Sequence, residues 1–296
     1  MSVKPSTLRL YEKEWQIFIH FCNSNSLSFL PASSDTVERF MSCHVDSRAM
    51  STLPTVLSAI SHFHSKFHHP SPTTSRSITK ALEGAKRSFG KPSVSAKVFT
   101  SEHLTILSAV ARKPSCSFIF LRTVWRIFIE FFGLLRFNEV ANLRYDDLVW
   151  THIGFNILIR KSKTDQHAKG DYISISRNIN DILCPVSLTL LYLKRLNYTT
   201  GYLLPTLKGK VPDPDNPLSY STALRDLRKC LSFVNIDPAG FGEHSGRRGG
   251  TTAAALSGAS IDELMLQGRW RSSDMPRLYS DNASKLGEIL LFAYLL

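Results

Sequence analysis

The sequence predicts a mostly helical α+β protein: an N-terminal helical bundle, then a mixed domain with a small antiparallel sheet. Three observations lead to this prediction. Apolar residues recur every three to four positions over residues 1–90, with no alternating strand pattern. A Pro-containing stretch without periodicity, residues 91–99, is typical of a linker. Residues 100–296 combine helical periods with two segments rich in β-branched and aromatic residues.

The N-terminal region carries two apolar stripes that predict amphipathic helices, one from Leu8 to Cys22 and one from Val56 to Phe67. Residues 35–43 predict a short helix between them, with Ser34 or Asp35 as its N-cap. These elements would form a small bundle.

A histidine cluster closes the second stripe, and its members are His62, His64, His68 and His69. His64 and His68 are one helical turn apart and could chelate a metal. Because no acidic or cysteine ligand is close in the sequence, we favour a helix face that is solvated or faces DNA.

The second region is expected to begin with a helix at Thr100, followed by a long buried helix over residues 118–135. Residues 153–159 and 171–175 predict two strands joined by a hairpin whose tip, residues 160–170, is basic.

After Pro185 the pattern is helical to the C-terminus, apart from a predicted proline-rich loop over residues 211–217. A capping box, Ser260 to Glu263, predicts the start of one of these helices, and Pro276 should lie in the first turn of a later, short helix.

The charge balance points to a polyanionic partner. Lys and Arg number 36 against 24 Asp and Glu, which gives a net charge of +12. Residues 1–99 hold 12 basic and 6 acidic side chains, and the remaining residues hold 24 and 18. A chain that is basic in both regions favours duplex DNA or RNA as the ligand, although a merely basic protein is the alternative.

Composition also argues against several classes of protein. The N-terminus lacks the apolar core of a secretory signal, and the most apolar stretch, residues 124–137, is interrupted by charged side chains. No membrane association is therefore expected. The five cysteines are scattered without any CxxC spacing, which favours a reducing intracellular compartment, the cytoplasm and nucleoid or the nucleus depending on the host.

Two segments carry candidate residues around the predicted long helix and hairpin. Arg136 is expected to end the long helix, with Glu139 three residues later and within helical reach of it. A purely structural salt bridge is the alternative. Lys163 on the hairpin tip could reach into a ligand groove, and a solvated turn is the alternative there.

Two later segments hold further candidates. His244 and Arg247 are three residues apart, so on a helix they would present an imidazole and a guanidinium to the same phosphate. Trp270 and Tyr279 are nine residues apart near the C-terminus. An isolated tyrosine is more often a packed core residue, and each motif alone is weak.

The combined set resembles the active site of the tyrosine recombinases, the phage-type integrases. The matching positions, in chain order, are Arg136, Glu139, Lys163, His244, Arg247, Trp270 and Tyr279. The local match resembles the Cre-like variety, in which tryptophan stands where other members have histidine. Asn138 and the absence of a leucine-glycine-histidine phrase before Trp270 depart from the family pattern. Lys161 and Lys169 remain alternatives to Lys163, which the step Lys163-Thr164 favours.

The resemblance implies a core-binding domain (1–90), a linker (91–99) and a catalytic domain (100–296) that cut and rejoin DNA strands through a 3′-phosphotyrosyl intermediate. Tyr279 would be the nucleophile, and Arg136 and Arg247 would hold the phosphate charge. His244 would assist proton transfer, and Lys163 would protonate the leaving oxygen. Glu139 would support Arg136, and Trp270 would contact the phosphate and brace Tyr279.

The resemblance also implies a reaction without metal, ATP or another cofactor, and double-stranded DNA as partner. The protein would be a homotetramer on DNA and a monomer or weak dimer when free. The apolar tail, residues 287–296, would dock on a neighbouring protomer or cap its own core. A type IB topoisomerase and a catalytically inactive DNA-binding protein of the same fold are the alternatives.

Overall fold

The computed structural model describes residues 3–47, 50–90, 96–160 and 170–279, without the side chains of residues 6 and 45–47. The chain divides into two compact units, Met1–Val94 and Ser95–Leu296. The division falls inside the linker that the sequence predicts, and each unit has its own apolar core.

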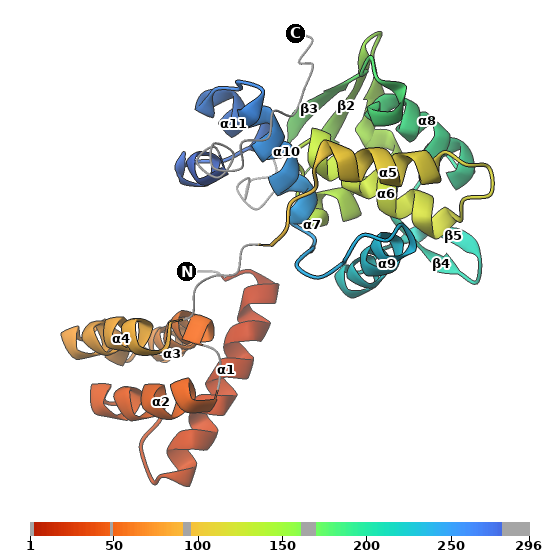
Figure 1. The fold of residues 1–296 in the computed structure, drawn as a ribbon. Helices are drawn as coiled ribbons and strands as arrows, with labels where there is room; N and C mark the ends of the chain where they lie inside the picture. Colours follow the sequence, from red (N-terminus) through yellow and green to blue (C-terminus); the bar gives the residue numbers. More distant parts are fainter. Residues whose placement is uncertain (1–2, 48–49, 91–95, 161–169, 280–296) are drawn as a thin grey trace. The chain divides into compact units, whose positions relative to one another are not determined.

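In the described residues of the N-terminal unit, the secondary structure consists of helices without strands (Figure 1). Its helices are α1 (Pro5–Ser24), α2 (Ser34–Ser47), α3 (Leu53–Lys66) and α4 (Arg76–Phe89). The predicted stripes form its core: Trp15 of α1 stacks on Phe63 of α3 with ring centres 5.0 Å apart. Both predicted N-caps of α2, Ser34 and Asp35, were too late in the chain, because the hydroxyl of Ser33 accepts from the backbone N–H of Thr36.

The histidine cluster does not form a metal site within the described part of the chain. His64 is fully buried, and both of its ring nitrogens are bonded to backbone. Nε2 accepts from the N–H of Ala32 at 2.9 Å, and Nδ1 bonds with the carbonyl of Ile60 at 2.8 Å. His64 therefore ties α3 to the loop before α2, and its chelation with His68 is ruled out in this state.

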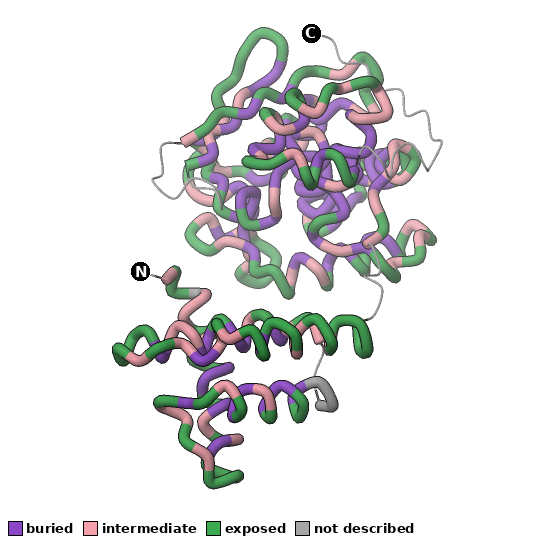
Figure 2. Tube along the Cα trace, turned by 90° about the vertical axis from the view of Figure 1, so that its left-hand side faces the viewer, coloured by how far each residue is buried: buried purple, intermediate pink, exposed green. Residues whose placement is uncertain are grey.

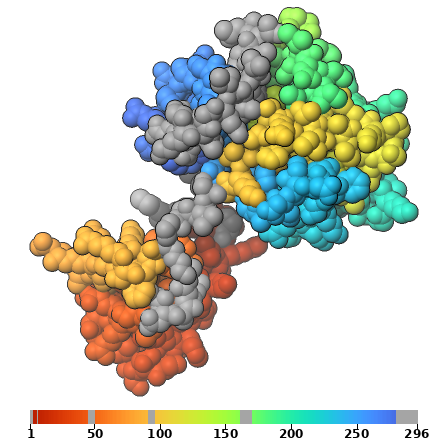
Figure 3. All heavy atoms as spheres, in the orientation of Figure 1, coloured from red at the N-terminus to blue at the C-terminus, as the bar shows by residue number. Residues whose placement is uncertain are grey.

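The larger unit is built around one buried helix, α6 (Phe118–Phe132). Figure 2 shows the buried segments gathered in the interior of this unit. The helices packed around α6 are α5 (Ser101–Ala111), α7 (Phe137–Ala141), α8 (Pro185–Leu196), α9 (Tyr220–Phe233) and α10 (Ser245–Leu256). The α5 and α9 segments both reach the surface of the face shown in Figure 3. Helix α11 (Ile261–Gly268) packs on α10.

Two small antiparallel sheets complete the larger unit. The predicted hairpin forms β2 (Gly154–Ile159) and β3 (Asp171–Ser176), to which β1 (Leu148–Trp150) adds in the order β1-β2-β3. The predicted loop over 211–217 was wrong: this segment is β5 (Val211–Pro217), paired with β4 (Pro205–Lys208). A two-stranded sheet consists of edge strands only, and edge strands tolerate proline, which has no N–H to donate.

Helix starts were predicted better than helix ends. Thr100 caps α5, and Ser260 and Glu263 form the predicted capping box at α11. Helix α6 ends at Phe132 rather than at residue 135, because Leu134 adopts a left-handed backbone with φ +48°. Within the described ranges, none of the helices combines the length and hydropathy that crossing a bilayer requires. All five cysteines are free thiols, and Cys43 alone among them is exposed.

Candidate active site

Helix α10 is held against the core by its glycines. A Cβ on Gly249 would lie 2.3 Å from the carbonyl oxygen of Phe99, and one on Gly250 would lie 1.9 Å from that of Phe131. Only glycine allows this approach of α10 to α6. The close packing fixes the positions of the residues that precede and follow these glycines, including Arg247.

Arg247 points into the unit from the first turn of α10 and is 5% exposed. Its Nη1 donates to the carbonyl of Leu134 and its Nη2 to that of Gly268, both at 2.5 Å. Its guanidinium carbon lies 4.1 Å from the centre of the Trp270 ring. Burial, followed by the charge of Arg136, lowers the pKa of Arg247 to about 9.

Glu139 connects three arginines, Arg136, Arg247 and Arg269, which we call the arginine cluster. Its carboxylate accepts from Nη1 of Arg136 at 2.8 Å and from Nη2 of Arg269 at 2.7 Å, and it lies 4.0 Å from Nη1 of Arg247. It also accepts from the backbone N–H of Arg136 at 2.8 Å. Arg136 lies in the N-cap position of α7 rather than at the end of α6, and 19% of its side chain is exposed. The predicted pairing of Arg136 with Glu139 is confirmed.

Tyr279 lies at the end of the described helical segment 274–279 and is 7% exposed. Its ring centre is 6.1 Å from that of Trp270. Burial raises the pKa of Tyr279, whereas the charges of Arg248, Arg247 and Arg136 lower it. The phenol therefore lies within electrostatic reach of the arginine cluster.

His244 precedes α10 rather than lying inside it. It is the exposed N-cap residue, and its carbonyl accepts from the N–H of Arg248 at 3.0 Å. Its backbone is already helical, with φ −93° and ψ −6°. The predicted spacing of one helical turn between His244 and Arg247 is therefore retained at the entrance of α10.

No family model matches the sequence. An integrase/recombinase xerD homologue from Selenomonas ruminantium is 25% identical over 288 residues, which cover 96% of this chain and 83% of the relative. A XerH site-specific recombinase bound to palindromic difH substrate has a TM-score of 0.62 at 16% identity, and the match covers 86% of this chain and 70% of the XerH chain. A Tn1549 transposon integrase in complex with circular intermediate DNA has a TM-score of 0.61 at 14% identity, and the match covers 96% of this chain and 94% of the integrase chain.

The chain has the tyrosine recombinase fold. The similarities in sequence and fold together support membership of the tyrosine recombinase and integrase family. The predicted fold class is confirmed. At these identities the solved structures show the fold alone.

The recombinase fold brings five predicted residues together: Arg136, Glu139, Arg247, Trp270 and Tyr279. His244 lies at the start of the helix that carries Arg247. Lys163 and its alternatives Lys161 and Lys169 lie outside the described residues, as does the tail 287–296.

Two members of the site were missed from the sequence, Arg269 and Gly268. Arg269 is 8% exposed and has a left-handed backbone with φ 55°, which turns its side chain back to Glu139. A Cβ on Gly268 would lie 1.9 Å from Cζ3 of Trp270. The glycine two residues before Trp270 was the available signal, since glycine allows another group to approach the backbone closely.

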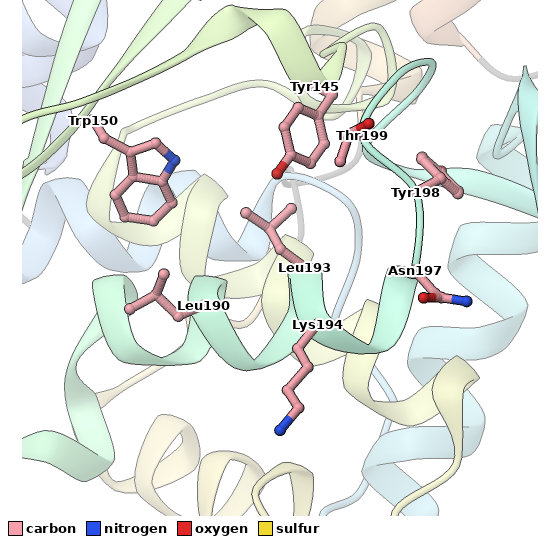
Figure 4. Close-up of a pocket in the computed structure, with 8 residues that line it drawn as sticks. All are labelled: Tyr145, Trp150, Leu190, Leu193, Lys194, Asn197, Tyr198 and Thr199. Carbon is pink, nitrogen blue, oxygen red and sulfur yellow. The ribbon is translucent and has the colours of Figure 1, made fainter.

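A hollow of about 640 Å³ lies elsewhere on the larger unit, beside α8 (Figure 4). The residues that line it are Tyr145, Trp150, Leu190, Leu193, Lys194, Asn197, Tyr198 and Thr199. None of these is a predicted site residue. The hollow is therefore separate from the arginine cluster.

Proposed function

We propose that this protein is a site-specific DNA recombinase or integrase that cuts and rejoins strands through a 3′-phosphotyrosyl intermediate, with Tyr279 as its nucleophile. One observation carries the proposal. The ring of Tyr279 contacts Trp270, whose ring stacks on Arg247, and Glu139 lies between Arg247 and Arg136. A phenol and two guanidiniums thus converge on one region.

The arginines supply the positive charge of the site. The oxygen of Tyr279 attacks phosphorus, and the charge of the pentacoordinate transition state develops on the non-bridging oxygens. Arg136 and Arg247 each offer planar N–H groups to these oxygens. A guanidinium has five N–H groups, so the two bonds of Arg247 to carbonyls do not exhaust its donors.

Strand cleavage needs two proton transfers, and rejoining reverses both, so that the attacking 5′-hydroxyl loses a proton and Tyr279 regains one. Tyr279 loses its proton as it attacks, and its raised pKa makes an acceptor at this step necessary. We assign that assistance to His244, which lies at the N-cap of the helix that carries Arg247. Lys163 donates a proton to the leaving 5′-oxygen. A 5′-hydroxyl then attacks the phosphotyrosine and releases Tyr279.

Trp270 supports assignment to the Cre-like variety, because it stands nine residues before Tyr279 at the position of the family histidine. Its indole N–H can donate to the phosphate, and its ring contacts Tyr279. In this proposal the two guanidiniums supply the positive charge that a metal would otherwise provide. The chemistry also uses no ATP or other cofactor, because the phosphotyrosine conserves the energy of the broken bond.

Double-stranded DNA is the proposed substrate, bound by a core-binding domain (1–90) and a catalytic domain (100–296) joined by the linker 91–99. Helix α4 supports this assignment, since its surface exposes Arg76, Lys80, Lys86 and Arg87 with a single acidic residue, Glu83. Phosphate contacts of this kind make the affinity fall steeply with salt. We further propose a homotetramer on DNA, with the tail 287–296 docking between protomers, and an intracellular site of action.

Covalent trapping tests the proposal. Binding-site selection with the Tyr279→Phe variant first defines a target, and a nicked suicide duplex is built on it. Wild-type protein should give an SDS-stable adduct and Tyr279→Phe none, whereas Tyr172→Phe, on the exposed part of β3, should behave as wild type. A bound duplex without any adduct would identify an inactive DNA-binding protein. Relaxation of supercoiled plasmids that lack the target would favour a type IB topoisomerase.

A further inference from the structure

Arg248 lies directly after Arg247, and its guanidinium carbon is 5.8 Å from the centre of the Tyr279 ring. We propose that Arg248 is a positioning residue for the nucleophile: it holds the Tyr279 ring against α10 and favours the phenolate form. This inference rests on the proposed function and deepens it. None of the family-derived roles described above falls on this residue.

Two neighbouring rings lie between two guanidiniums at this place. Arg247 lies on Trp270 at 4.1 Å, Trp270 lies 6.1 Å from Tyr279, and Arg248 lies 5.8 Å from Tyr279. Helix α10 supplies both guanidiniums, and the segment 270–279 supplies both rings.

Arg247 and Arg248 have different surroundings because of their positions on α10. Consecutive residues on a helix point about 100° apart, so Arg247 and Arg248 leave α10 in different directions. Arg247 turns inward, where it donates to the carbonyls of Leu134 and Gly268. Arg248 is only partly buried and meets the ring of Tyr279. The first is suited to hold the phosphate, and the second to hold the nucleophile.

A cation near an aromatic ring is attracted by its negative face, and the attraction grows when the phenol becomes a phenolate. Burial raises the pKa of Tyr279, and the charge of Arg248 is the largest opposing influence, ahead of Arg247 and Arg136. The contact thus lowers the barrier to removing the proton and restricts the ring at the same time.

The test compares Arg248→Gln and Arg248→Lys with Arg228→Gln, which removes the same charge from an exposed position on α9. Single-turnover formation of the covalent adduct is measured against pH at saturating DNA, and dissociation constants are measured by gel shift. Arg248→Gln should slow adduct formation about tenfold near neutral pH and move the alkaline rise about one pH unit higher. Arg248→Lys should recover part of the rate, and Arg228→Gln should match wild type.

The direction of the pH shift is decisive. Loss of a positive charge beside a phenol raises its pKa, so the profile must move upward. If Arg248→Gln weakens DNA binding but keeps the wild-type pH profile, Arg248 is a phosphate contact and the proposal is wrong.

A second measurement does not depend on catalysis. With 3-fluorotyrosine at position 279 of the full-length chain, fluorine NMR reports the ring environment and its titration without DNA. Arg248→Gln should shift the resonance and raise the pKa, and Arg228→Gln should change neither. If wild-type protein forms no adduct, the proposed function fails while this titration still decides the role of Arg248. An unchanged titration in Arg248→Gln would overturn the proposal.

Discussion

The central carbon of the Arg247 guanidinium lies 4.1 Å from the centre of the Trp270 ring. This contact joins α10 to the residue that follows the C-cap of α11, and Trp270 in turn contacts Tyr279. A displacement of Trp270 therefore changes the surroundings of both the arginine proposed to bind phosphate and the proposed nucleophile.

Replacement of Trp270 should separate its two roles. Trp270→Phe keeps a ring for Arg247 and Tyr279 but loses the indole N–H, so cleavage should fall about tenfold or less. Trp270→Ala removes the ring and should lower single-turnover cleavage about 100-fold or more. Thermal melting checks that both variants are folded. Equal activity of the alanine variant and wild type would show that the stack has no part in catalysis.

Gly268→Ala should act on the same contact through backbone packing. The new Cβ would lie 1.9 Å from Cζ3 of Trp270, so the indole must move. We expect a loss of stability of about 1–3 kcal/mol and a loss of cleavage similar to that of Trp270→Ala. Gly242→Ala is the matched control, because a Cβ there meets nothing within 4 Å. Similar melting temperatures for the two variants would contradict this account.

The sequence predicts this fold well where the pattern is local. Periodicity located α1 and α3, enrichment in β-branched and aromatic residues located β2 and β3, and side-chain chemistry located the caps at Thr100 and Ser260. The Arg136–Glu139 pair was also accessible, since residues three apart on a helical turn can contact each other.

Features that depend on tertiary contacts were not accessible in the same way. The end of α6 depends on the left-handed backbone of Leu134, whose carbonyl accepts from Arg247, a residue 113 positions away. The role of Arg269 depends on Glu139, 130 positions away. The proline-containing β5 became a strand because β4 provides a partner for it.

Glu139 should be essential for the stability of the arginine cluster. The Glu139 carboxylate is 4% exposed and Arg269, its partner at 2.7 Å, is 5% exposed, so Glu139→Gln leaves a buried guanidinium without a counter-charge. We expect a loss of about 2–4 kcal/mol in the free energy of unfolding, measured with urea.

The control for this prediction is Asp237→Asn. Asp237 pairs with Lys97 at a similar distance, 2.9 Å, but both side chains are about half exposed or more. Exposed pairs contribute little, so its urea midpoint should stay close to wild type. Comparable effects of the two substitutions would show that burial is not what gives the Glu139 contacts their strength.

A second cluster of buried charged residues packs against the first turn of α10. Arg126 contacts both Glu130 and Glu243, and all three are almost fully buried. A Cβ on Gly246 would lie 2.8 Å from Oε2 of Glu130, so this group packs directly against the first turn of α10. Burial raises the pKa of Glu130 to about 8 although the charge of Arg126 opposes the shift. One guanidinium thus faces two carboxyl groups, and we expect Glu130 to hold a proton at neutral pH.

The raised pKa makes stability depend on pH in a defined direction. An unfolded glutamate ionises near its ordinary pKa of 4.5, so between pH 4.5 and about 8 the folded chain holds a proton that the unfolded chain lacks. Stability should therefore fall as pH rises through this window.

Glu130→Gln mimics the protonated group, so its free energy of unfolding should depend less on pH. At pH 8.5 this variant should be more stable than wild type by roughly 1–3 kcal/mol. Urea unfolding of the full-length chain from pH 5 to 9 measures this, with Glu263→Gln as the control because the pKa of that exposed carboxylate is lowered and its titration lies below the window. If the free energy of unfolding depends on pH equally in wild type and Glu130→Gln, Glu130 is ionised in the folded protein and Arg126 balances both carboxylates.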